Sequence, residues 1–320
     1  MKFLKKYSFL IGIIIFILIV MRLDFSKLIT ILNEINYFYL FFAIPFLVPM
    51  LVIKAYRWNY LKKRQGINYS FKESFLMYGS GMYIGILTPG RLGEIGKIFF
   101  LKNDHCSLGK SAVSIVLDRL ADLIFLLFFG YFGLLFFFSF FKNFILILSL
   151  ILVLSLILLI IFLKTNLIQF FLKKIFYLII PFKYQKSWKI NFQDFINELK
   201  IYKFKNYLFI FITTFFSWLA YYLHNFLLAR SIGINTVSFL FISITITIAA
   251  LISLLPVSIL GLGTRDATLI LLLSAFSISQ EIAISFSFLI LLMAVLMGLI
   301  CFACWLIRPI QLPKVSKKIC

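Results

Sequence analysis

Long runs of apolar residues, almost free of charge, recur along this chain and are separated by shorter segments rich in Lys. Each run approaches the roughly 20 residues that a helix needs to cross the hydrocarbon core of a bilayer. The pattern therefore predicts an all-α polytopic membrane protein with about six transmembrane helices. The predicted spans are Tyr7 to Met21, Ile35 to Ile53, Leu123 to Phe141, Phe144 to Leu163, Tyr207 to Ala229 and Ile282 to Ile307.

Two further apolar segments, residues 73–101 and 237–279, are interrupted in the middle by Pro and Gly. Basic loops flank the first segment on both sides, so it is predicted to enter the membrane and return as a helical hairpin. The second segment has the same kind of break and would enter from the opposite side. Gly81 and Gly85 would let the first hairpin pack closely against a neighbouring helix. The sequence thus predicts two re-entrant hairpins arranged as inverted repeats, an arrangement that marks the binding site of many transporters.

Composition supports this assignment, and the distribution of charge indicates how the chain is oriented in the membrane. Of the 320 residues, 63% are apolar and 13% are charged, against roughly a quarter charged in soluble domains. The net charge of +21 need not indicate a nucleic-acid partner, because most Lys and Arg residues fall on one side if the N-terminus is inside. The prediction is a multi-pass protein of the inner (cytoplasmic) membrane with both termini cytoplasmic. Residues 1–310 form one transmembrane domain, and residues 311–320 form a short basic tail.

Residues 164–206 form the longest polar stretch and are strongly basic. Their regularly spaced apolar side chains predict a helix lying on the cytoplasmic leaflet, with its lysines facing anionic headgroups. A solvated basic loop is the alternative. The spaced residues are Phe192, Phe195, Ile196 and Leu199.

Charged residues at the two breaks, and on the helix that follows the first break, form the candidate translocation site. A charge near the bilayer centre costs several kcal/mol unless it is paired or hydrated. The functional hypothesis is that Arg91 and Arg265 receive a lipid phosphate, while the carboxylates position them or bind a coupling cation. The alternative is that the charges only neutralise one another and hold the hairpins. The candidate residues are Pro89, Gly90, Arg91, Gly93, Glu94, Asp118, Arg119, Asp122, Pro256, Gly261, Gly263, Arg265 and Asp266.

Metal and cofactor chemistry find no support in the sequence. Cys301 and Cys304 have the spacing of metal ligands, but they lie in an apolar helix without a second ligand pair and are interpreted as packing residues. His224 is either a proton relay or a hydrogen-bonded structural histidine. Pro45 and Pro49 are expected to kink the second span, with the freed carbonyls bonded by neighbours. No nucleotide-binding loop is present, so no catalytic residue, metal or cofactor is assigned.

Three motifs resemble the transmembrane, flippase-like region of lysylphosphatidylglycerol synthases and their stand-alone relatives. They are TPGRLGEIGK at 88–97, LDRLAD at 117–122, and Leu-Pro at 255–256 followed by GLGTRD at 261–266. The resemblance covers nearly the whole chain, although Asp118 and Asp266 stand where the family pattern has Glu. The full-length synthases carry a soluble aminoacyl-transfer domain, which this chain is expected to lack because it ends soon after its last helix.

The resemblance implies translocation or handling of a membrane lipid, either an anionic phospholipid or a polyprenyl-phosphate lipid. It also implies an enzyme of lipid or envelope glycan assembly as a partner. The expectation is a lipid flippase-like transporter that is not an enzyme. Two alternatives stay open. A membrane-embedded lipid or glycan transferase, or an accessory subunit of one, would use Glu94 or Asp118 as a general base. A non-transporting scaffold would recruit a partner through the Lys-rich segment.

Overall fold

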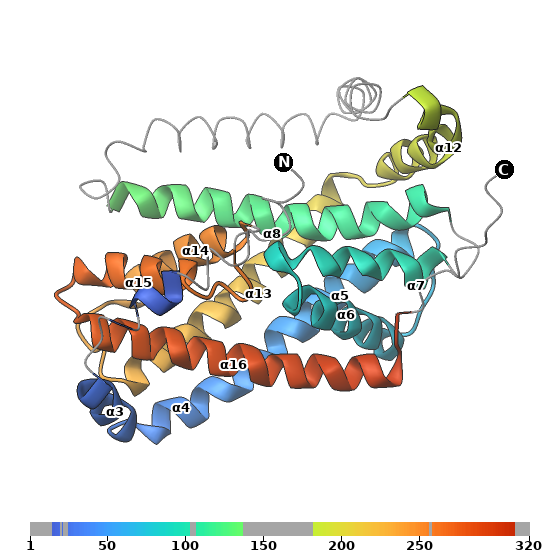
Figure 1. Ribbon diagram of the computed structural model, residues 1–320. Coiled ribbons are helices and arrows are strands. Elements are labelled where there is room, and N and C mark those ends of the chain that lie inside the picture. The colour runs from blue at the N-terminus through green and yellow to red at the C-terminus, as the bar shows by residue number, and fades with distance from the viewer. Residues whose placement is uncertain are drawn as a thin grey trace.

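The computed structural model describes residues 15–19, 21, 25–102, 107–136, 182–255 and 258–310. Every regular element in these residues is a helix (Figure 1), which confirms the predicted fold class. The predicted span Phe144 to Leu163, most of Tyr7 to Met21 and the basic tail lie outside the described residues.

Long helices form the frame of the described bundle. They are α4 (Tyr37–Ala43) continued by the 3-10 turn η1 (Ile44–Phe46) and α5 (Leu47–Arg64), then α8 (Leu108–Phe136), α13 (Phe204–Ser231) and α16 (Gln280–Ile307). The segments Tyr37–Arg64, Phe204–Ser231 and Gln280–Ile307 each have 28 residues and are apolar enough to cross a membrane. These three overlap predicted spans, although the first continues beyond its predicted end at Ile53. The helices α8 and α16 run along the length of the molecule (Figure 1).

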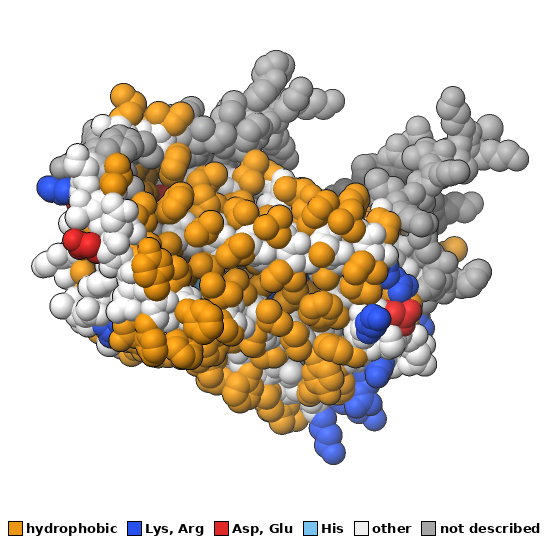
Figure 2. Space-filling model, turned by 90° about the horizontal axis from the view of Figure 1, so that it is seen from below, with side chains coloured by type: hydrophobic (Ala, Val, Ile, Leu, Met, Phe, Trp, Pro, Cys, Tyr) orange, Lys and Arg blue, Asp and Glu red, His pale blue; other side chains and the backbone are white. Residues whose placement is uncertain are grey.

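The outer surface of the bundle has the character expected of a lipid-facing protein. In Figure 2, hydrophobic side chains cover the middle of the visible face, while Lys and Arg side chains gather mainly at one end. Large apolar side chains such as Phe211, Phe288 and Leu299 are exposed at about half or more of their surface. Soluble monomers rarely expose continuous apolar surface of this extent, so the belt is best solvated by lipid tails.

The first interrupted segment folds as a hairpin. It consists of α6 (Phe71–Ile86), the 3-10 helix η2 (Pro89–Lys97) and α7 (Ile98–Lys102), and η2 packs against α6. A Cβ atom at Gly81 or Gly85 would overlap the side chains of Lys97 or Glu94. These two glycines were predicted to pack against a neighbouring helix, and their partner is the returning arm of the same hairpin. Small residues thus bring two charged side chains onto the backbone of α6.

The second interrupted segment also forms two packed helices, α14 (Phe239–Ser253) and α15 (Thr264–Ser274). The intervening turn uses left-handed backbone at Gly261 and Gly263, with φ of 77° and 78°, which only glycine adopts without strain. In Figure 1, α14 and α15 lie in the opposite half of the bundle from α6 and α7. This placement agrees with hairpins that enter from opposite sides, and the sides themselves remain a prediction.

The break between α4 and α5 depends on a proline and a buried histidine. Pro45 lies in η1, where the helix changes register. The carbonyl of Ala43 accepts a hydrogen bond from Nδ1 of His224 on α13, at 2.8 Å. At Pro45 the chain therefore passes from α-helix to 3-10 helix, and a neighbouring side chain bonds a carbonyl beside it, whereas Pro49 lies within the continuous α5. Of the two interpretations of His224, this contact supports a hydrogen-bonded structural histidine.

A helix, α12 (Phe182–Leu199), occupies the C-terminal part of the basic segment and packs against α8. Ile196 and Leu199 are buried, and Leu199 belongs to a small apolar cluster with Leu61 of α5 and Val113 of α8. Lys110 forms an ion pair with Glu198 at 3.1 Å. Part of the apolar face of this helix therefore packs on protein.

Ser70 caps the N-terminus of α6, and its loss should weaken the first hairpin. Its side chain accepts a hydrogen bond from the backbone N–H of Glu73, whose carboxylate accepts one from the backbone N–H of Ser70 at 2.9 Å. We expect Ser70→Ala to lower the free energy of unfolding by about 1 kcal/mol. Thermal unfolding of the purified chain measures this effect. Ser274→Ala, at the opposite end of the bundle, is the control, and an equal loss there would contradict the capping role.

Candidate functional site

Charged side chains from three elements, α5, η2 and α8, meet near the middle of α8. Asp118 and Asp122 lie four residues apart on α8 and therefore share one face of that helix. The face is directed at α5, where Arg57 bridges both carboxylates. Its Nη2 lies 2.7 Å from Oδ1 of Asp118 and its Nη1 lies 3.0 Å from Oδ1 of Asp122. Lys54, about one helical turn before Arg57, lies 2.8 Å from Oδ2 of Asp122.

The first hairpin contributes the other side of this cluster. Lys97 at the end of η2 places Nζ 3.3 Å from Oδ2 of Asp118 and 3.7 Å from Oε2 of Glu94. Arg119 of α8 pairs with Glu94, with 2.7 Å between Nη1 and Oε2. Its Nη2 lies 3.0 Å from Oδ2 of Asp118. We name this set the charge network, and its members are Lys54, Arg57, Glu94, Lys97, Asp118, Arg119 and Asp122.

Uncharged partners hold the network to the surrounding helices. The hydroxyl of Tyr78 on α6 donates to Asp118 at 3.2 Å and accepts from Arg119 at 2.8 Å. On α13, the hydroxyl of Thr214 accepts a hydrogen bond from Arg57 at 2.6 Å, and the indole N–H of Trp218 donates to Asp122 at 3.3 Å. The network therefore ties α5, α6, η2, α8 and α13 together.

Burial makes these contacts energetically important. The side chains of Arg57, Lys97 and Asp118 are fully buried, and that of Glu94 is 2% exposed. Arg119 differs, because 29% of its side-chain surface is exposed. Within the described residues the network holds four cations and three carboxylates, so the cations are in excess. Buried ions are tolerated only when they are paired and hydrogen-bonded.

Three cations of the network were missed by the sequence prediction. The second span was predicted to end at Ile53, which assigned Lys54 and Arg57 to a cytoplasmic loop, and Lys97 was not among the candidate site residues. The helix instead continues to Arg64. No Gly or Pro interrupts the chain between Ile53 and Gly66, so the absence of a helix breaker was the available signal. Lys54 and Arg57 therefore lie in a helix and not in a cytoplasmic loop.

The predicted residues around the first break have different environments. Glu94 enters the network, whereas the Arg91 side chain is exposed at the tip of the hairpin and forms no ion pair with any described residue. Pro89 begins η2, and Gly90 and Arg91 adopt left-handed φ of 61° and 56°. The backbone N–H of Gly93 donates to the hydroxyl of Thr88 at 2.7 Å. Arg91 therefore does not take part in the mutual pairing that the sequence suggested.

The residues of the second break form a separate group. Nη2 of Arg265 lies 3.0 Å from Oδ1 of Asp266, and its Nε donates to the hydroxyl of Ser287 on α16 at 2.8 Å. Oδ2 of Asp266 accepts a hydrogen bond from the backbone N–H of Gly263 at 2.7 Å. No ion pair between described residues joins this group to the charge network. Arg265 and Asp266 thus neutralise each other and hold the turn to α16. Pro256 lies outside the described residues.

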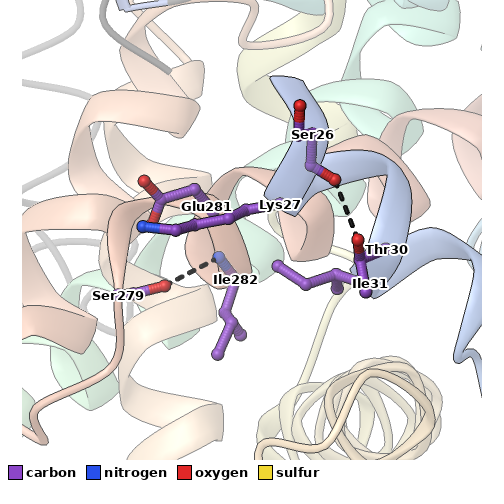
Figure 3. Close-up of a pocket in the computed structure, with 7 residues that line it drawn as sticks. All are labelled: Ser26, Lys27, Thr30, Ile31, Ser279, Glu281 and Ile282. Carbon is purple, nitrogen blue, oxygen red and sulfur yellow. Dashed lines mark hydrogen bonds between the residues drawn. The ribbon is translucent and has the colours of Figure 1, made fainter. Parts of the chain in front are cut away.

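A pocket of about 330 Å³ lies elsewhere, between α3 (Phe25–Asn33) and the start of α16. Figure 3 shows the side chains of Lys27 and Glu281 pointing toward one another across it. The hydroxyl of Thr30 donates to the Ser26 carbonyl at 2.9 Å. None of the predicted site residues lines this pocket. Its lining residues are Ser26, Lys27, Thr30, Ile31, Ser279, Glu281 and Ile282.

Comparison with protein families decides the relationship of the chain. The family described as the lysylphosphatidylglycerol synthase TM region matches residues 7–301. The chain belongs to this family. The description of this family supports a membrane protein with a lipid-related role. The resemblance that the three motifs indicated is therefore confirmed, and the chain is a multi-pass integral membrane protein.

The chain is similar to two archaeal membrane proteins. A UPF0104 membrane protein of Methanocaldococcus jannaschii is 28% identical over 299 residues, which cover 88% of each chain. A UPF0104 membrane protein of Pyrococcus horikoshii is 27% identical over 126 residues, or 38% of each chain. No solved structure matches the chain. The names of these relatives describe membrane proteins and specify no activity.

Proposed function

We propose that this protein is a lipid flippase-like transporter that moves an anionic lipid headgroup across the inner (cytoplasmic) membrane, with both of its termini in the cytoplasm. The cargo would be a phospholipid or a polyprenyl-linked lipid, both of which carry phosphate. The single observation that supports this proposal most is the charge network, which lies buried among apolar helices. Charges at such depth in membrane proteins usually mark the path of a substrate or an ion.

The composition of the network favours an anionic cargo. Its cations outnumber its carboxylates within the described chain, and the side chain of Arg119 is partly exposed. A guanidinium can donate two parallel hydrogen bonds to phosphate oxygens. Arg265, which was expected to receive the phosphate, already donates to Ser287, Asp266 and the carbonyl of Leu260. We therefore assign the headgroup to Arg119 and not to Arg265.

Translocation of labelled lipids in proteoliposomes tests this function. Labelled phosphatidylglycerol, a polyprenyl phosphate and phosphatidylcholine would be followed with wild type, Glu94→Gln and protein-free vesicles. We expect wild type to move an anionic lipid, and Glu94→Gln to reduce the rate to that of protein-free vesicles, because an amide cannot neutralise Arg119. The matched control is Glu73→Gln, on the same hairpin but outside the network, where Gln still serves a capping box.

Each other outcome favours a different function. Chemical change of the labelled lipid without movement would support a membrane transferase that uses Glu94 or Asp118. Folded protein that neither moves nor changes any of these lipids would contradict the transporter proposal. A scaffold would then be supported if removal of residues 169–203 abolished cellular function while Glu94→Gln did not.

A further inference from the structure

We propose that Glu94 is an exchangeable counter-ion, whose carboxylate occupies in this structure the place at Arg119 that a phosphate headgroup takes when the cargo binds. The inference rests on the proposed function, since it concerns the same network. It assigns the ligand by its chemistry, as a phosphate ester. It also gives Glu94 a role in regulating access to Arg119, beyond that of a fixed structural ion pair.

Glu94 has fewer contacts than the other two carboxylates of the network. Asp118 accepts hydrogen bonds from Arg57, Lys97, Arg119 and Tyr78, and Asp122 accepts them from Lys54, Arg57 and Trp218. For Glu94, the structure gives the contact to Arg119 at 2.7 Å and the longer one to Lys97 at 3.7 Å. Its displacement would therefore break fewer interactions than displacement of either aspartate.

Arg119 is the member of the network that a headgroup can reach. Its side chain is 29% exposed, while the side chains of the other members are at most 9% exposed. Its Nε–H is buried and has no hydrogen-bond partner among the described residues. An incoming phosphate could accept from this unused donor as well as from Nη1. The guanidinium thus has a hydrogen-bonding capacity that Glu94 does not satisfy.

The backbone around Glu94 is suited to a local shift. Glu94 lies in η2 (Pro89–Lys97), three residues after a kink at which Gly90 and Arg91 adopt left-handed backbone. Left-handed backbone is strained for a non-glycine residue such as Arg91. A change in η2 could relieve this strain and withdraw Glu94, while the pairs between α5 and α8 stay in place.

The exchange also conserves charge. A phosphodiester carries one negative charge, as the Glu94 carboxylate does, so replacement of one by the other leaves the net charge of the network unchanged. Withdrawal of Glu94 without a replacement would leave four cations against two carboxylates in the described network. Because uncompensated buried charge is costly, movement of Glu94 would be coupled to arrival of the anion.

Binding to the purified full-length chain tests the exchange separately from transport. Titration calorimetry in detergent would use short-chain phosphatidylglycerol, short-chain phosphatidylcholine and inorganic phosphate. We expect Glu94→Gln to bind phosphatidylglycerol about fivefold more tightly, or more, than wild type, because a competing anion is lost. Arg119→Gln should bind it weakly, and the gain from Glu94→Gln should vanish in the Arg119→Gln background. Glu73→Gln should bind like wild type.

Unchanged or weaker binding by folded Glu94→Gln would overturn the exchange. If Glu94→Gln does not fold, Glu94→Asp provides the same test, because its shorter side chain weakens the contact to Arg119 and should also tighten binding. Inorganic phosphate that binds as tightly as phosphatidylglycerol would overturn the assignment to a lipid headgroup. Tighter binding by Glu94→Gln without transport by wild type would support the exchange and refute the flippase. Transport by wild type, without tighter binding by Glu94→Gln, would support the flippase and refute the exchange.

Discussion

Replacement of Arg57 by Met is expected to lower the free energy of unfolding by about 3–5 kcal/mol, a large part of the roughly 5–15 kcal/mol of a typical protein. Arg57 is fully buried, and its guanidinium contacts both Asp118 and Asp122 within 3.0 Å. Met fills much of the same volume but brings no charge. Lys54, Lys97 and Arg119 cannot compensate fully, because they approach other carboxylate oxygens.

Thermal unfolding of the purified protein measures this loss. The control is Lys63→Gln, which removes an exposed cation from the same helix and should change stability by less than about 0.5 kcal/mol. A second variant, Arg57→Met with Asp118→Asn and Asp122→Asn, separates charge from packing. It should recover part of the stability, because removal of a whole buried ion group is often tolerated. Wild-type stability of Arg57→Met would refute the structural importance of the network.

The second large effect is expected for Gly93→Ala. A Cβ atom at position 93 would lie 2.4 Å from the carbonyl oxygen of Ile84 and 2.7 Å from its carbonyl carbon. These are backbone atoms of α6, which cannot rotate away as a side chain does. The two arms of the first hairpin must therefore separate. We expect a loss of roughly 1–3 kcal/mol, together with loss of transport, because Glu94 is the next residue.

Gly96→Ala is the matched control for this substitution. A Cβ at Gly96 would meet the end of the Ile310 side chain at 3.3 Å, and a small rotation of that side chain removes the contact. Both glycines lie in η2, so a general preference for Ala in helices would affect them similarly. Unfolding midpoints and accessibility of a cysteine introduced at Ile84 would be compared. Equal stability of the two variants would contradict the close packing of the hairpin arms.

The sequence determined the fold class, because the length and apolar character of each long segment indicate by themselves that it lies in lipid. The segments Tyr37–Arg64, Phe204–Ser231 and Gln280–Ile307 are long and apolar enough to span a bilayer whatever they pack against. The hairpin break at Pro89 and Gly90 could also be predicted from the sequence, since Pro and Gly interrupt a helix locally. The motifs around these breaks then indicated the family that the comparison confirmed.

Only the tertiary structure decided which charges meet. Arg57 and Asp118 are 61 residues apart in the chain, and helical spacing gives the face of a residue but not the helix that packs on that face. The sequence therefore grouped Arg91 and Arg265 with the carboxylates, whereas folding placed Lys54, Arg57 and Lys97 beside them. The physical reason is that a buried charge is stabilised by partners within about 4 Å, and these distances are set by the packing of several helices at once.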